Sequence, residues 1–244
     1  KKALIPYFTF GYPSIDQMPE LIQKSIQSGA KMIEIGLPFS DPIADGPVIQ
    51  NSHLETLQKY PKISFDDLFE VIEKTNPSVP IIIMTSINLI MAYGIKLFFK
   101  NASKYIEGVV IPDLPVESAS EIEKEAKKNK ISLNFLISPL CSEKRMTQLV
   151  KKSTGFVYLI STLGTTGERT SLDKNLKKIV QKIKAIKNIP VAIGFGISSK
   201  EQVDLAYQMA DGAIIGSHFI KLIAKTKDQK GWIDQLGQRL QALQ

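Results

Sequence analysis

The chain has 244 residues, 43% of them hydrophobic and 23% charged, which is enough apolar material for a substantial buried core. The formal net charge of +7 comes from lysines set between apolar positions, as in Lys124–Lys130 and Lys177–Lys187, so it indicates solvated helix faces rather than a nucleic-acid surface. One cysteine, Cys141, excludes a disulfide framework or a cysteine metal cluster. Neither a signal peptide nor an apolar run of the ~20 residues of a membrane span is visible, so we expect a cytoplasmic protein.

Runs of apolar and β-branched residues predict eight strands, separated by segments with the spacing of amphipathic helices. The strands are expected at Ala3–Phe10, Met32–Leu37, Val79–Thr85, Gly108–Leu114, Ile131–Ser138, Phe156–Ser161, Pro190–Phe195 and Gly212–Gly216. Helices are expected at Met18–Ser28, Phe65–Lys74, Ser118–Lys128, Leu172–Ile186 and Lys200–Met209, with a terminal helix within Asp228–Gln244. Any helix before the first strand is expected to be absent or short.

The strands are apolar almost throughout, so both faces of the sheet must be covered, as in a parallel sheet wrapped by helices. Eight strand–helix units favour a (β/α)8 TIM barrel over a doubly wound open sheet. No linker or charge block divides the chain. We therefore predict one α/β barrel domain over residues 1–244.

The second predicted strand, Met32–Leu37, holds a glutamate in an otherwise apolar run. Because side chains alternate between the faces of a strand, Ile33, Ile35 and Leu37 suit packing against outer helices, and Glu34 faces the barrel interior. It lies near the carboxyl end of the strand, where barrel enzymes keep their active sites. Partial desolvation there raises the pKa of a carboxyl group towards the range useful for proton transfer. An ion pair is the alternative, but no predicted strand supplies a lysine or arginine.

The loop after this strand contains Asp41 and Asp45 among Pro, Ser and Gly. Aspartates in such a loop are most often turn formers. One of them could instead be the second carboxylate of an acid/base pair, and the spacing alone leaves this open.

Glycines mark the ends of the last two predicted strands, in Gly194–Ser198 (GFGIS) and Ile214–Phe219 (IIGSHF). Each leads into a helix. Barrels bind phosphate at these positions, where backbone N–H groups and a helix N-terminus meet the anion. We predict a phosphate site there, with simple tight turns as the alternative.

The loop Ser161–Asp173, after the sixth strand, is long and rich in Gly and Thr. We predict that it is a mobile lid over the site, with a disordered surface loop as the alternative.

The stretch EIGLPFSDPIADGPVIQ (Glu34–Gln50) closely resembles the signature of the tryptophan synthase α-subunit family. The resemblance continues along the chain in IPYFTFGYP, IPDLPVE, TTGER, GFGIS and the GS after the last strand. It implies retro-aldol cleavage of indole-3-glycerol phosphate to indole and glyceraldehyde 3-phosphate, with indole passed to a β subunit. The resemblance also implies an α2β2 heterotetramer in which the β subunit carries pyridoxal phosphate, and no cofactor or metal in the α chain.

By this resemblance Glu34 is the catalytic acid/base, and Asp45 hydrogen-bonds the indole N–H and stabilises developing positive charge. Tyr7, which stands where phenylalanine is common, and Tyr158 are expected to line the pocket. The further substrate-binding positions that the resemblance implies are Thr166, Gly167, Gly194, Phe195, Gly196, Gly216 and Ser217. The partner interface is expected at Pro38, Asp41 and Asp113.

Some positions depart from the family pattern. Ser86 and Leu89 stand where many members have a tyrosine and often a proline, Thr162 where some have arginine, and Thr165 where valine is usual. These changes concern the pocket wall and the lid, so they bear on substrate affinity and lid closure more than on the type of reaction.

The remaining single-copy residues have ordinary interpretations. Trp232 is expected to pack the last helix, His53 and His218 to be structural or exposed, and Cys141 to have no nucleophilic role.

Two other functions stay open. Another phosphate-binding barrel lyase or isomerase, such as indole-glycerol-phosphate synthase, would need a strand-end lysine or a second strand-end carboxylate. An α-like subunit that only activates its β partner is compatible with the departures at Ser86 and Thr162, although Glu34 and Asp45 are retained.

Overall fold

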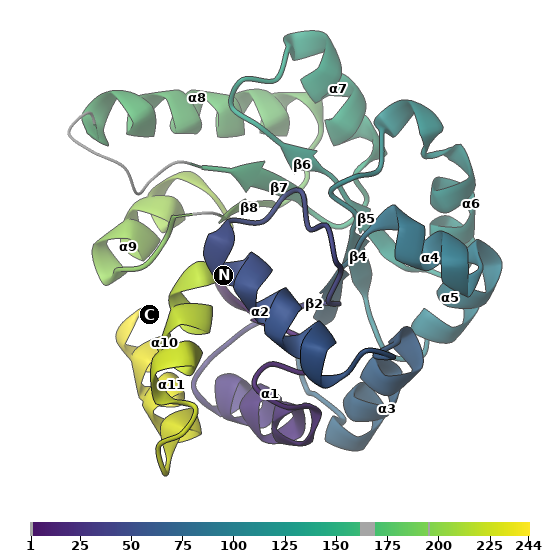
Figure 1. Cartoon of the computed structure of the whole chain (residues 1–244). Coiled ribbons are helices and arrows are strands. Elements are labelled where there is room, and N and C mark those ends of the chain that lie inside the picture. Colours follow the sequence, from purple (N-terminus) through teal and green to yellow (C-terminus); the bar gives the residue numbers. More distant parts are fainter. Residues whose placement is uncertain (1, 162–168, 195) are drawn as a thin grey trace.

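The computed structural model is a nearly closed barrel of parallel strands with helices around it (Figure 1). It describes residues 2–161, 169–194 and 196–244, with the backbone alone given for 169–174. In this part of the chain the strands form one sheet in the order β5-β4-β3-β2-β1-β9-β8-β7-β6, and each pairing is parallel. The predicted (β/α)8 architecture is confirmed.

The strands alternate with helices along the chain. The strands are β1 (Ala3–Thr9), β2 (Ile33–Gly36), β3 (Ile81–Met84), β4 (Gly108–Val110), β5 (Ser132–Asn134), β6 (Leu136–Ile137), β7 (Val157–Ile160), β8 (Val191–Gly194) and β9 (Gly212–Ile215). The α-helices are α1 (Met18–Gln27), α2 (Pro47–Lys59), α3 (Phe65–Thr75), α4 (Ile87–Tyr93), α5 (Ile95–Ala102), α6 (Ser120–Lys128), α7 (Glu143–Lys152), α8 (Arg169–Ile186), α9 (Lys200–Met209), α10 (Ser217–Thr226) and α11 (Trp232–Ala242). Two short 3-10 helices are η1 (Ile15–Gln17) and η2 (Val116–Ser118).

The fifth predicted strand, Ile131–Ser138, is two short strands rather than one. β5 pairs with β4 and β6 pairs with β7, so the chain passes from one neighbour to the other at Phe135. The Phe135 N–H donates to Ser153 Oγ (3.3 Å), and its carbonyl accepts from the Tyr158 N–H (3.0 Å). This segment therefore completes the barrel wall although β5 and β6 do not pair with each other.

The predicted strand Gly108–Leu114 is too long. β4 ends at Val110, and the chain turns back through a hydrogen bond from the Leu114 N–H to the Ile111 carbonyl (3.2 Å). Pro112 within this turn has no N–H to offer a neighbouring strand.

The predicted helices are present, and α9 agrees at both ends. Ser64 and Ser199 begin α3 and α9 with capping boxes that satisfy backbone N–H groups of the first turn. The terminal segment Asp228–Gln244 contains α11, and its Trp232 is buried in the core as predicted. None of the described helices is long and apolar enough to cross a bilayer.

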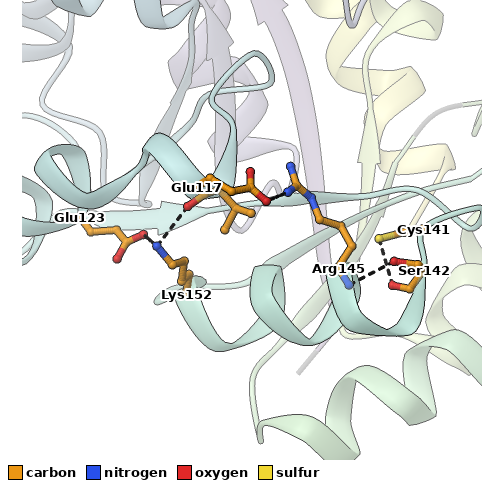
Figure 2. A network of polar contacts seen from close by, with 7 residues as sticks. Glu117, Glu123, Cys141, Ser142, Arg145 and Lys152 are labelled. Carbon is orange, nitrogen blue, oxygen red and sulfur yellow. Dashed lines mark hydrogen bonds and ion pairs between the residues drawn. The ribbon is translucent and has the colours of Figure 1, made fainter.

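Polar contacts also link η2, α6 and α7 on the outside of the barrel (Figure 2). Arg145 pairs with Glu117, and Lys152 pairs with Glu123 while donating to the Val116 carbonyl (3.1 Å). Partly exposed ion pairs of this kind contribute about 0–1 kcal/mol each. The outer helices therefore owe their position mainly to the apolar core, and the site is built on the strands within it.

Candidate active site

Two adjoining cavities open at the carboxyl ends of the strands. The first lies between the segments that follow β2, β3 and β4, and the second, of about 520 Å³, lies between α2 and the segments that follow β8 and β9. Tyr7, Asp45 and Met84 line both cavities. The two are therefore parts of one site, at the end of the barrel where the sequence placed it.

Glu34 is on β2, in register with Tyr7 of β1 and Ile82 of β3. It is 1% exposed, and within the described residues neither of its carboxyl oxygens has a hydrogen-bond partner. Burial, and then the charge of Asp45, raises the pKa of Glu34 to about 8. The group is thus a neutral acid at pH 7, with no protein partner in the described structure to hold its proton.

The ion-pair explanation for Glu34 finds no support in the described residues, where no salt bridge includes it. Glu34 is not itself among the residues that line the two cavities. It is in register with Tyr7, which lines both cavities. Burial raises the pKa values of Tyr7 and Tyr158, and a charge on Glu34 would add to both shifts. Glu34 therefore lies beside the wall of the site.

Two glycines make room for these tyrosines. A Cβ at Gly36 would lie 2.1 Å from the Tyr7 hydroxyl, and a Cβ at Gly194 would lie 2.5 Å from that of Tyr158. Any larger residue at either position would displace a ring that forms the wall. Gly194, predicted as a substrate-binding residue, thus has a clear packing role.

Asp45 lies in the loop between β2 and α2 and is half-buried. Its N–H donates to the Pro42 carbonyl (3.0 Å), and its own carbonyl accepts from Gln50 Nε2 (2.8 Å). These bonds hold the backbone and leave the carboxylate on the cavity wall. Burial raises the pKa of Asp45 to about 6, so it is mostly ionised at pH 7 while Glu34 is not.

The residues predicted to face a partner differ in exposure. Pro38 is buried, and Asp41 is exposed at the first cavity. Asp113 is half-buried and accepts hydrogen bonds from Ser86 Oγ (2.5 Å) and the Ile87 N–H (2.9 Å). Ser86, one of the departures from the family pattern, thus begins α4 and fixes Asp113.

The second cavity has features of an anion site. Gly196, after β8, and Gly216 and Ser217, at the start of α10, line it, and the first backbone N–H groups of a helix have no acceptor within the helix. That these residues bind phosphate stays a prediction. His218 and Lys221 also line this cavity, and the sequence interpretation did not place them there. The spacing of three residues on one helix, which places both side chains on one face, is the signal that could have found them.

The guanidinium of Arg239 holds the His218 ring in place. Arg239 Nε donates to His218 Nε2 (2.9 Å), and Arg239 Nη2 donates to the Ser198 carbonyl (3.0 Å). Burial, followed by the charges of Arg239 and Lys221, lowers the pKa of His218. This imidazole is therefore neutral at pH 7 and carries its proton on Nδ1.

Some predicted positions lie outside the described residues. These are Thr166, Gly167 and Phe195, the departures Thr162 and Thr165, and the loop predicted as a lid over most of its length. Leu89 is described and packs half-buried against the core.

The arrangement suits one kind of chemistry. It combines a buried neutral acid, an ionised carboxylate, apolar wall residues such as Ile49 and Ile214, and an anion-binding end. An elongated substrate with an apolar head and a phosphate tail fits these groups, and proton transfer is the reaction that they can support.

Comparison with known proteins agrees with this picture. A family model described as the tryptophan synthase alpha chain matches residues 1–243. The tryptophan synthase alpha chain of Thermococcus kodakarensis is 39% identical over 232 residues, which cover 93% of this chain and 91% of the relative. The solved structure of tryptophan synthase subunit alpha from Campylobacter jejuni has a TM-score of 0.90 at 28% identity, covering 100% of this chain and 96% of the other. A chain of the tryptophan synthase complex from Pyrococcus furiosus has a TM-score of 0.86 at 31% identity, covering 99% and 97%.

The anion site can be tested with inorganic phosphate alone. Lys221→Ala should weaken phosphate binding roughly tenfold, the effect of losing one charged contact. Gly216→Asp should weaken it further, because a side chain there meets Ile49 (3.2 Å) and Tyr7 (3.3 Å) and adds a like charge. Calorimetric titration is the measurement, and Lys225→Ala, one turn further along α10, is the matched control. Equal affinity in Lys221→Ala and Lys225→Ala would show that Lys221 does not contact the anion.

Proposed function

Because this chain belongs to the tryptophan synthase alpha chain family, we propose that it cleaves indole-3-glycerol phosphate to indole and glyceraldehyde 3-phosphate. Family membership makes it a lyase of tryptophan biosynthesis and an α subunit. The retro-aldol step and the residues that perform it are the proposal. The observation that carries it is the buried, unpartnered carboxyl of Glu34, next to a cavity that Asp45 also lines.

The proton transfers follow from the two pKa values. Glu34, protonated below about pH 8, delivers its proton to C3 of the indole ring. The resulting Glu34 carboxylate then takes the proton of the C3′ hydroxyl. The bond between C3 and C3′ breaks, its electrons return to the ring, and the hydroxyl carbon becomes the aldehyde of glyceraldehyde 3-phosphate.

Asp45 acts on the charge that this step creates. Protonation at C3 places positive charge on the ring and its N–H. An ionised carboxylate hydrogen-bonded to that N–H stabilises the charge, and a partly dry site strengthens the effect. Asp45 is ionised above about pH 6, so the active combination of a neutral Glu34 and a charged Asp45 exists between about pH 6 and about pH 8.

This chemistry needs acid/base groups alone, so we propose that the α chain holds no cofactor and that pyridoxal phosphate belongs to a β subunit. A cytoplasmic location is proposed with it, in keeping with a chain whose one cysteine is unpaired.

A β subunit would bind at the open end of the barrel. Ile43, Met91 and Leu140 are 69%, 60% and 96% exposed, and they lie on the segments that follow β2, β3 and β6. Large apolar side chains exposed around one rim are typical of a protein interface. The solved Pyrococcus furiosus relative is itself described as a tryptophan synthase complex. We propose an α2β2 assembly with this rim, including Asp41, as the contact.

The first test concerns the two carboxylates. Glu34→Gln should lower indole formation from indole-3-glycerol phosphate by at least a factor of about 100, because the amide cannot transfer a proton. Asp45→Asn should cause a loss of similar order through the missing charge. The wild-type rate should fall as the pH drops below about 6, where Asp45 is protonated, and as it rises above about 8, where Glu34 ionises.

Glu125→Gln is the matched control for this test, because Glu125 is also a buried glutamate but lies on α6, outside both cavities. It should turn over at the wild-type rate. A wild-type chain that releases no indole, with or without a β subunit, would refute the proposed cleavage.

The second test concerns the partner surface. Leu140→Ser should weaken binding of a β subunit roughly tenfold, since an exposed apolar anchor would be lost from the contact. Asp41→Ala should reduce the acceleration by the β subunit more than it reduces the basal rate, because it acts on coupling between the subunits. Titration of indole formation with β subunit measures both. Lys31→Ser, at the opposite end of the barrel before β2, is the control. If Leu140→Ser and Asp41→Ala respond to the β subunit as Lys31→Ser does, the interface lies elsewhere.

A further inference from the structure

We propose that His53 is a positioning residue, which holds the loop that carries Asp45 through an ordered chain of buried hydrogen bonds. His53 is on α2 and is 4% exposed. It connects the start of this loop to the inner wall of the barrel. The inference rests on the proposed function, because it assigns His53 to the placement of Asp45 in that reaction.

The two ring nitrogens of His53 have different partners. Nδ1 accepts from the Phe39 N–H (3.2 Å), and Nε2 lies 3.1 Å from the Tyr7 hydroxyl. A backbone N–H can only donate, so Nδ1 must be without a proton. The single proton of the neutral ring is therefore on Nε2 and is donated to the Tyr7 oxygen.

A second set of buried hydrogen bonds lies beside this one. Thr9 is on the same face of β1 as Tyr7. The Thr9 and Ser52 hydroxyls are 2.6 Å apart, and Ser52 Oγ donates to the Ile49 carbonyl (2.7 Å). Since Ser52 gives its proton to Ile49, Thr9 donates to Ser52. The chain from Phe39 through His53 to Tyr7 and the chain from Thr9 through Ser52 to Ile49 thus join α2 and its preceding loop to β1.

These hydrogen bonds have a consequence for the loop between β2 and α2. Phe39 is near the start of the loop, and Ile49, Ser52 and His53 are in the first two turns of the helix that follows it. The hydrogen bond of His53 to Phe39 therefore joins the two ends of the segment that contains Asp45. A substitution at His53 that removes these bonds should therefore shift the loop relative to the wall formed by Tyr7, and Asp45 with it.

The surroundings of His53 keep the ring in the state that this role requires. Tyr7 faces it from β1, the Phe39 N–H faces it from the loop, and Asp41 and Asp45 line the same cavity. Burial lowers the pKa of His53 to about 4, and the smaller opposing effect of the Phe39 backbone does not offset it. The imidazole is thus neutral at pH 7, and Nδ1 can accept.

Tyr7 and His53 depend on each other. A phenylalanine, the residue common at position 7, would leave the Nε2 proton of His53 without its acceptor. Likewise an apolar residue at position 53 would leave the Phe39 N–H without its partner. A buried polar group that loses its partner destabilises the structure. The two substitutions should therefore be strongly non-additive.

The first readout is the protonation state of the ring, which does not depend on activity. ¹⁵N NMR of the wild-type chain should show His53 neutral, with the proton on Nε2, at about pH 6 and at about pH 8. A proton on Nδ1, or a charged ring at either pH, would overturn the proposal.

The second readout is kinetic. His53→Leu should lower kcat for indole formation roughly tenfold with a smaller change in KM, because misplacing Asp45 acts on the transition state. His53→Gln should recover most of the loss, since its side-chain oxygen can accept from Phe39 and its amide can donate to Tyr7. Ser25→Ala, which removes a buried hydroxyl bonded to the Leu21 carbonyl on α1 (2.7 Å), is the control and should keep the wild-type kcat.

The two proposals fail in different ways. A folded His53→Leu protein with the wild-type kcat would refute the role of His53 and leave the proposed lyase reaction intact. A wild-type chain without turnover would refute the reaction, and the tautomer measured by NMR would then decide the hydrogen-bond chain on its own. If His53→Leu does not fold, the comparison of His53→Gln with the wild type applies. His53→Gln should keep most of the wild-type kcat, and a tenfold loss in this folded variant would count against the proposal.

Discussion

The site depends on one physical constraint, which is the burial of an unpaired carboxyl group inside the barrel. Raising the pKa of Glu34 from 4.5 to about 8 corresponds to about 5 kcal/mol against ionisation. A protein that needed only stability would fill this position with an apolar residue or pair the charge. Here the described structure provides neither, and the proton stays on Glu34 until a substrate can receive it.

The parts around Glu34 are arranged to maintain this state. Gly36 and Gly194 give space to Tyr7 and Tyr158, whose rings exclude water from the interior next to Glu34. Asp45 adds a negative charge that raises the pKa of Glu34 further, and the same charge later serves the substrate. Glu34 is thus protonated and Asp45 mostly ionised at pH 7, because Glu34 is fully buried and Asp45 lies in a half-buried loop.

Local patterns predicted those features that depend on local physics. Alternation along Met32–Leu37 was enough to turn Glu34 inward, and glycines at strand ends were enough to point to Gly196 and Gly216, which line the second cavity. The break at Phe135 was missed because it depends on which neighbours pair with each half of the strand. The hydrogen bonds of His53 and His218 were also not predicted. Their partners, Tyr7 and Arg239, are 46 and 21 residues away in the chain, and no local spacing reveals such contacts.

The central claim is tested most directly by titrating Glu34 itself. ¹³C NMR of the side-chain carboxyl carbon, assigned by loss of the signal in Glu34→Gln, can be followed from about pH 3 to about pH 10. The account predicts a pKa near 8 in the wild-type chain. It also predicts a lower value in Asp45→Asn, because the charge that disfavours ionisation is gone. A Glu34 pKa near its ordinary value of 4.5, unaffected by Asp45→Asn, would contradict the account.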